Sequence, residues 1–162
     1  MRIEQADGIS YSVLLRGKEV IAASKIDLKV VGHGWLGEQA SEPSVTERSE
    51  TEKVEFVVPR KFRQLDTKYN QIELEFADGT KLVFRAYDEG VAYRWATQFP
   101  GEITVEDELA QFIFPGQPNA WFPEEESIQT HQDRVYTYVS LAEIVPERFC
   151  STDMLVHLND GP

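Results

Sequence analysis

Apolar and polar positions along this chain alternate with a period of two, which is typical of β-strands with one buried face. The clearest example is residues 70–76, where Ile72, Leu74 and Phe76 share one face and polar side chains occupy the other. No stretch of twelve or more residues shows a good helical face. The pattern therefore predicts an all-β fold.

Two turn sequences divide the centre of the chain into three strands. Asp78-Gly79 is a strong hairpin signal between residues 70–76 and 82–87, and Asp88-Glu89-Gly90 leads into residues 91–95. We predict an antiparallel meander whose register is fixed by these turns. Its core face should hold Ile72, Leu74, Phe76, Leu82, Phe84 and Ala86.

Shorter runs on both sides of the meander extend the pattern to ten to thirteen strands, which argues for a sandwich or barrel. Arg16-Gly17-Lys18 reads as a tight turn, and residues 32–52 read as a long loop or ragged edge strand. We expect one domain over residues 1–162. The remaining predicted strands are 9–15, 19–21, 28–31, 103–106, 111–114, 120–122, 134–141 and 154–158.

The composition narrows the function classes. The chain has 28 acidic and 16 basic residues and a net charge of −12, which repels nucleic-acid backbones. Acidity of this kind serves solubility, or some carboxylates hold a divalent cation. No apolar run is long enough for a membrane span, and the first residues do not form a signal peptide. The chain is either cytosolic or has lost an upstream segment.

Few residues offer independent chemistry. The one cysteine, Cys150, excludes an internal disulfide and has no neighbour that would lower its pKa, so an ordinary thiol is expected. His33 lies in a Gly-rich segment, and His157 between apolar residues indicates a structural role. His131 is two residues from Asp133, on the same side of an extended chain. That pair is either a solvated strand end or part of a site.

A second candidate site begins at Trp121, which is followed by Phe122, Pro123 and the run Glu124-Glu125-Glu126. Aromatic rings stack on sugars, and carboxylates accept hydroxyl hydrogen bonds or bind calcium. A run of three glutamates is nevertheless usually a solvated loop, and this is the interpretation that we favour. Motifs of serine hydrolases, P-loops, dinucleotide-binding folds and metalloproteases are absent from the sequence.

The segment Phe84-Arg85-Ala86-Tyr87-Asp88-Glu89-Gly90-Val91-Ala92-Tyr93-Arg94 strongly resembles the Phe-Arg-Ala-Tyr-Asp-Asp-Gly-Val-Ala-Phe-Arg signature of glycoside hydrolase family 97, in its N-terminal domain. Further similar motifs occur in the expected order along most of the chain. These are residues 11–13 with 17–21, residues 69–74, Phe114-Pro115, Ala120-Trp121, and Tyr136 with residues 140–144.

This resemblance implies the N-terminal domain of a bacterial exo-acting α-glycosidase, of the α-glucosidase or α-galactosidase type. The implied fold is a β-super-sandwich similar to galactose mutarotase, packed on a catalytic (β/α)8 barrel that would follow residue 162. The 162 residues alone should be inactive and should line one wall of the pocket for an oligosaccharide or glycoside. The parent protein would be periplasmic or secreted.

The resemblance also implies calcium, held mainly by the barrel and by one glutamate of the N-terminal domain in a Tyr-Glu-x-x-Tyr pattern. Here Asp133 falls on that glutamate, one methylene shorter, and Gln132 replaces the first tyrosine before Tyr136. The resemblance thus implies Asp133 as a metal ligand. The alternative is that His131 makes a polar contact to the substrate, and Trp121 is the aromatic residue expected to contact the sugar.

Two alternatives belong to other classes. The first is a free-standing carbohydrate-binding module that uses Trp121, Phe122 and the nearby glutamates. The second is a mutarotase-like enzyme, which would need a histidine acid and a carboxylate base. A domain separated from its barrel should also expose an apolar patch larger than a few hundred Å² and could self-associate through it.

Overall fold

The computed structural model describes residues 1–162 except 39–40, 60, 131–132, 152–153 and 160–162. The chain forms two compact units. Unit 1 contains Met1 and residues 3–10 and 25–110, and unit 2 contains Arg2 and residues 11–24 and 111–162. The prediction of an all-β fold built from antiparallel sheets is confirmed. Over the described residues, no helix has the length and apolarity needed to cross a bilayer.

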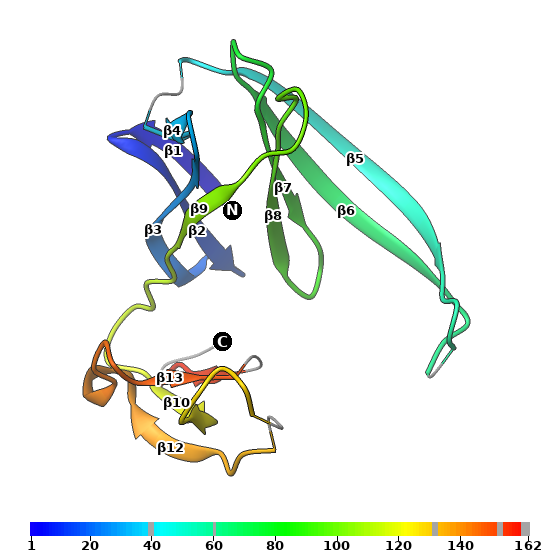
Figure 1. Ribbon diagram of the computed structural model, residues 1–162. Coiled ribbons are helices and arrows are strands. Elements are labelled where there is room, and N and C mark those ends of the chain that lie inside the picture. The colour runs from blue at the N-terminus through cyan, green and yellow to red at the C-terminus, as the bar shows by residue number, and fades with distance from the viewer. Residues whose placement is uncertain (39–40, 60, 131–132, 152–153, 160–162) are drawn as a thin grey trace. The chain divides into compact units, whose positions relative to one another are not determined.

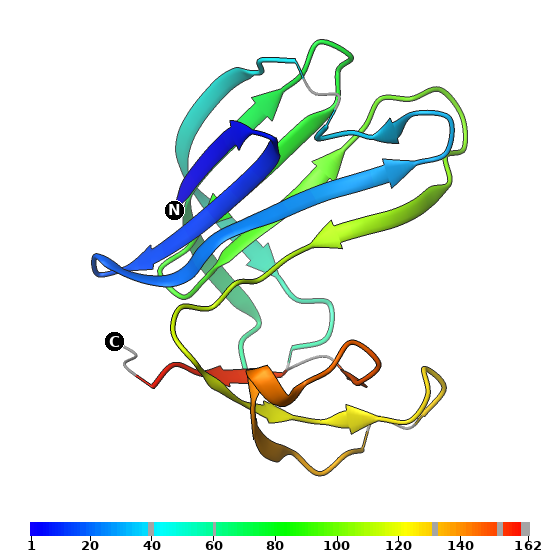
Figure 2. The same ribbon diagram turned by 90° about the vertical axis from the view of Figure 1, so that its left-hand side faces the viewer.

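The first sheet has the strand order β1-β2-β3-β4, and β9 also pairs with β3. Figure 2 shows the blue strands β1 to β3 beside the lime-green β9. The tight turn before β3 is confirmed, with positive φ angles of 52° at Arg16 and 84° at Gly17. The strand bounds are β1 Arg2–Ala6, β2 Gly8–Leu15, β3 Lys18–Val30, β4 Gly34–Trp35 and β9 Val105–Ala110.

Three strand predictions in this sheet were wrong in their bounds. Residues 19–21 and 28–31 were expected as separate strands, but Lys18–Val30 is one continuous strand. Its central polar residues are accommodated because Ser24 bonds within the fold, with Oγ donating to the carbonyl of Ala22 and accepting from the amide of Ile113. The strand expected at 103–106 is displaced to Val105–Ala110.

The second sheet contains the predicted meander and has the order β5-β6-β7-β8. Leu74 lies opposite Leu82 and Ile72 opposite Phe84, as the Asp78-Gly79 turn predicts. Leu74, Phe76, Leu82 and Phe84 are buried, and Ile72 and Ala86 are half-buried. The predicted core face is therefore confirmed. The bounds are β5 Ser44–Glu55, β6 Gln64–Glu75, β7 Lys81–Ala86 and β8 Val91–Ala96.

The segment expected to be a loop or ragged edge strand contains a regular edge strand. β5 pairs with β6 without a break from Ser44 opposite Glu75 to Glu55 opposite Gln64. β7 pairs with β6 only between Asn70 and Glu75. The distal halves of β5 and β6 consequently form a long two-stranded arm, which Figure 1 shows in cyan and green. Its polar, charged sequence conceals the strand because nearly all of its side chains are exposed.

Unit 2 contains a three-stranded sheet of order β12-β10-β14 and the pair β11-β13. Residues 134–141 were expected as a strand, but the strand begins at Thr137 and a short 3-10 helix spans Leu141–Glu143. Residues 111–114 form a bridge, Ala22 opposite Ile113, instead of a full strand. The bounds are β10 Asn119–Phe122, β11 Glu124–Glu125, β12 Thr137–Ser140, β13 Phe149–Cys150 and β14 Leu155–His157.

A buried carboxylate connects β3 of unit 1 with the turn after β4. Asp27 Oδ1 accepts the backbone N–H groups of Leu28 at 2.7 Å and of Gly37 at 2.6 Å. A Cβ atom at Gly37 would lie 3.0 Å from the Asp27 carboxylate. Asp27 is buried and held by both bonds, so it has little freedom to move away.

We predict that Gly37→Ala destabilises the protein by about 1–3 kcal/mol, because the new methyl group overpacks against Asp27. Gly90→Ala is the matched control, since nothing lies within 4 Å of a Cβ atom at that position. Urea unfolding followed by circular dichroism measures both variants. Equal stability of the two variants would contradict the role given to Asp27.

Candidate functional site

The exposed face of the sheet β12-β10-β14 in unit 2 presents an aromatic cluster. Trp121 on β10 lies opposite Tyr138 on β12, with ring centroids 4.9 Å apart and planes inclined by 46°. Both side chains are substantially exposed, Trp121 at 43% and Tyr138 at 45%. The alternation of β10 explains this, because Ala120 and Phe122 on its other face are buried.

A hydrogen bond connects this cluster to the third strand. The hydroxyl of Tyr138 lies 2.7 Å from Nδ1 of the exposed His157 on β14. The cluster thus combines an apolar ring surface at Trp121 with polar groups at its rim. Such an arrangement can stack on a sugar ring and bind its hydroxyl groups.

An ion pair between the buried Glu125 and the half-buried Arg134 lies beyond the end of β10. Glu125 Oε2 accepts hydrogen bonds from Thr130 Oγ1 and Arg134 Nε, both at 2.7 Å. Its side chain is only 4% exposed. Its Oε1 is also buried and has no hydrogen-bond partner among the residues that the structure describes. Glu125 belongs to β11, which pairs with Phe149 and Cys150 of β13, so the prediction of a solvated glutamate loop was wrong here.

The two glutamates of β11 both carry arginine partners. The hydrogen bond from Arg134 lowers the pKa of Glu125, and Thr130 adds to this effect. Arg148 forms two bonds to Glu124, at 2.7 and 2.8 Å, and lowers the pKa of that carboxyl as well. Both glutamates are therefore held as carboxylates at neutral pH.

The predicted site residues differ in their placement. Trp121 is exposed, as substrate contact requires, and Asp133 is exposed as well. His131 lies outside the described residues. Phe122, which the binding-module hypothesis grouped with Trp121, is buried on the opposite face of β10, so that part of the hypothesis was wrong. Successive side chains of a strand point to opposite faces, which excludes a shared platform.

The described residues do not form a calcium site by themselves. Calcium takes six to eight oxygen ligands. No group of three or more His, Cys, Asp or Glu side chains that could hold a metal ion occurs in the described part of the chain. Asp133 could contribute one carboxylate, and the other ligands would have to come from elsewhere.

The remaining candidate residues have structural surroundings. The ring of His33 stacks on Phe99 with centroids 3.7 Å apart. Burial raises the pKa of the Cys150 thiol, and the charge of Glu125 adds to this effect. The thiol is thus a poor nucleophile at neutral pH, which agrees with the prediction of an ordinary thiol.

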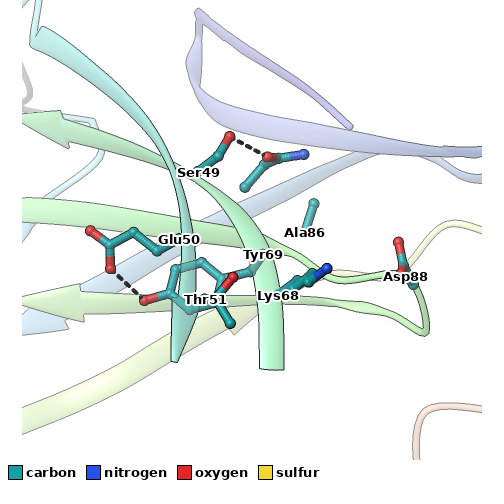
Figure 3. Close-up of a pocket in the computed structure, with 8 residues that line it drawn as sticks. Ser49, Glu50, Thr51, Lys68, Tyr69, Ala86 and Asp88 are labelled. Atoms are coloured by element: carbon teal, nitrogen blue, oxygen red, sulfur yellow. Dashed lines mark hydrogen bonds between the residues drawn. The ribbon is translucent and has the colours of Figure 1, made fainter. Parts of the chain in front are cut away.

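Unit 1 has a polar hollow of about 360 Å³ on the sheet β5-β6-β7 (Figure 3). Ser49 Oγ donates to Asn70 Oδ1 at 2.6 Å, and the Tyr69 hydroxyl donates to Glu50 at 3.0 Å. Both hydrogen bonds join β5 to β6, so these polar groups of the hollow help to hold the sheet together. The lining residues are Ser49, Glu50, Thr51, Lys68, Tyr69, Asn70, Ala86 and Asp88.

Sequence reasoning missed Tyr138 and the partners of Glu125, and it gave His157 a structural role, whereas His157 is exposed beside Tyr138. Tyr138 lies at an alternate position of a short strand, as Trp121 does, and this period is a signal that could have placed it on an exposed face. The pairing of Glu125 with Arg134 had no comparable signal, because it depends on the fold of the intervening loop.

Comparison with known proteins decides the family. The model of the glycosyl-hydrolase 97 N-terminal family matches residues 1–161. The chain belongs to this family. A retaining alpha-galactosidase of Bacteroides thetaiotaomicron is 24% identical over 167 residues, which cover 96% of this chain and 25% of the relative.

Solved structures agree on the fold of this family's N-terminal region. A glycoside hydrolase family 97 enzyme variant from Pseudoalteromonas sp. strain K8, in complex with panose, has a TM-score of 0.74 at 19% identity and covers 88% of this chain and 23% of its own. A beta-arabinopyranosidase has a TM-score of 0.70 at 18% identity, over 84% and 24% of the two chains. The chain thus spans about a quarter of the length of these relatives.

We predict that the Glu125–Arg134 pair makes stability pH-dependent. The folded-state pKa of Glu125 is lowered, so its stabilisation is present above the unfolded pKa of about 4.3 and is lost as the pH falls through the folded value. Glu125→Gln should therefore unfold at lower urea than the wild type at neutral pH, with the difference shrinking on acidification.

Glu126→Gln is the control for this prediction, because it removes the same charge from an exposed neighbour. Its stability should differ little from that of the wild type at either pH. A pH-independent difference between Glu125→Gln and the wild type would contradict the proposed electrostatic origin.

Proposed function

We propose that this chain is the non-catalytic N-terminal domain of an exo-acting α-glycosidase of the α-glucosidase or α-galactosidase type. One observation carries the proposal: the family match covers residues 1–161, yet the chain spans only a quarter of a relative named as a retaining alpha-galactosidase. The catalytic barrel would be supplied by the rest of the parent chain, and the parent enzyme would work in the periplasm or outside the cell.

The state of the carboxylates supports a non-catalytic role. Glycoside hydrolysis uses two carboxyl groups on opposite sides of the scissile bond, and the acid needs a raised pKa. Glu73, Glu124 and Glu125 each have a basic partner, and that partner lowers the pKa of the carboxyl group. A carboxylate held in this way is a poor proton donor.

The aromatic cluster is the part of the domain that we assign to the wall of the glycoside pocket. Trp121 would stack on a sugar ring, while Tyr138 and His157 would meet its hydroxyl groups. His131, two residues from Asp133 in the sequence, is proposed as a further polar contact to the substrate. Asp133 is proposed as one calcium ligand, with the other ligands supplied by the catalytic barrel.

A second candidate function is a free-standing carbohydrate-binding module. The exposure of the Trp121–Tyr138 pair favours it, because a module of this kind binds sugars through such a surface without catalysis. Saturable binding of an α-glucan or α-galactoside to the 162-residue chain, abolished in Trp121→Ala, would support this function.

Activity of two proteins tests the leading proposal. We expect the 162 residues alone to hydrolyse neither 4-nitrophenyl α-glucoside nor 4-nitrophenyl α-galactoside. A protein extended through the coding sequence that follows Pro162 should hydrolyse at least one of them. Activity of the 162 residues, or inactivity of the extended protein on both substrates, would contradict the proposal. Assays after chelation, with and without Asp133→Ala, report on the calcium contribution.

Trp121→Ala in the extended, active protein should raise KM by about tenfold with a smaller change in kcat, because the lost stacking contact is worth ~1.4 kcal/mol. Trp121→Phe should retain most of the affinity. Trp35→Ala in unit 1 is the control and should leave KM near the wild-type value. An unchanged KM in Trp121→Ala would exclude this residue from the pocket wall.

A further inference from the structure

The tip of the β5–β6 arm exposes apolar side chains that the fold of unit 1 does not use. Val57 is 98% exposed and Val58 72%, and Phe56 and Phe62 are exposed beside them. The β5–β6 ladder reaches the base of this tip, where the amide of Phe56 donates to the carbonyl of Arg63 at 3.0 Å. A large exposed apolar surface on an ordered element marks an interaction site.

The arm has little support from the rest of its sheet. β7 pairs with β6 between Asn70 and Glu75, so the part of β6 from Gln64 to Tyr69 pairs with β5 alone in the described structure. An isolated two-stranded hairpin is at best marginally stable in water. Docking of the tip would stabilise the arm and would bury its apolar residues.

The shape of the tip favours a protein partner over a lipid surface. Phe56, Val58, Lys61 and Phe62 line a hollow of about 350 Å³. A hollow of this kind accepts a protruding apolar side chain, and such fitted pockets are where anchoring side chains bind at protein interfaces. Binding to a bilayer needs a protruding apolar surface and does not need a hollow.

The charge of the tip indicates an acidic partner surface. Residues 56–65 contain three basic residues and no Asp or Glu, in a chain with a net charge of −12. The Arg63 side chain is 83% exposed and lies 3.7 Å from Glu55, a contact that contributes little in water.

We propose that the arm tip, residues 56–59 and 61–65, is the docking element that attaches this domain to an acidic, apolar-centred surface on the remainder of its parent enzyme. The inference rests on the proposed function. The remainder of the parent enzyme is chosen as the partner because about three-quarters of the length of each relative lies outside the matched region. Lys61 and Arg63 would pair with carboxylates around the contact, and an apolar side chain would enter the hollow.

Limited trypsin digestion tests this docking without reference to enzyme activity. Lys61 and Arg63 should be cleaved rapidly in the 162-residue chain. In the extended parent protein they should be cleaved at least about tenfold more slowly, because proteolysis follows the population of the open form. Mass spectrometry of the fragments identifies the cut sites.

Two variants of the extended protein separate docking from a general change in stability. Val57→Ser combined with Val58→Ser removes apolar surface from the tip and should restore rapid cleavage at Lys61 and Arg63. Val45→Ser is the control, since Val45 is an exposed valine of β5 at the end of the hairpin away from the tip, where it lies opposite Leu74. That control should keep the slow cleavage of the wild type.

The outcomes distinguish this inference from the proposed function. Equal cleavage of the tip in both proteins would overturn the docking, even if the extended protein hydrolyses α-glycosides. Protection that appears in the 162-residue chain as its concentration rises would assign the tip to a second copy and also overturn the proposal. Protection only with vesicles of anionic phospholipid would assign it to a membrane surface, with the same consequence. Slow cleavage without glycosidase activity would support the docking and count against the proposed activity.

Discussion

The β6–β7 turn determines which face of the central sheet is buried, and the rest of unit 1 depends on that choice. Asp78 accepts hydrogen bonds from the amide of Thr80 at 2.8 Å and from its hydroxyl at 2.9 Å, while Gly79 takes a φ of 81° between them. A shift of one residue in this hairpin would turn Leu74 and Leu82 toward the polar face. With the register held, the apolar face forms the core and the opposite face can carry ion pairs, such as Lys81 with Glu73 at 2.7 Å.

Local patterns predicted this part of the fold well, and long-range contacts explain where prediction failed. The meander was predictable because turn and alternation lie within a few residues of each other. β5 was hidden because its side chains are exposed on both faces, so the strand has no apolar period to detect. Glu125 is buried because β11 pairs with Phe149 and because a loop returns Arg134 to it. Neither contact can be inferred from the sequence Glu124-Glu125-Glu126 itself.

In the candidate site, too, local patterns were predictable and long-range strand pairing was not. Trp121 could be selected from the sequence, since an aromatic residue beside polar ones suits a sugar contact, and the strand alternation of β10 leaves it exposed. The same alternation excludes Phe122 from the site, although its position next to Trp121 in the sequence had suggested that both residues belong to it. Tyr138 joins the site through the pairing of β10 with β12, which no local pattern specifies.

The distribution of charge also fits a domain that acts through contacts with other parts of its parent protein. In unit 2 both glutamates of β11 are paired with arginines. Paired carboxylates suit a fixed scaffold better than they suit proton transfer. In unit 1 the tip of the arm has the opposite composition, with cations and apolar side chains but no acid between residues 56 and 65. If solubility were the only constraint on this surface, an acidic chain would be expected to carry Asp or Glu beside its exposed valines. The absence of acids there is better explained by a contact that carboxylates of this chain would oppose, and a partner surface with its own carboxylates satisfies that condition.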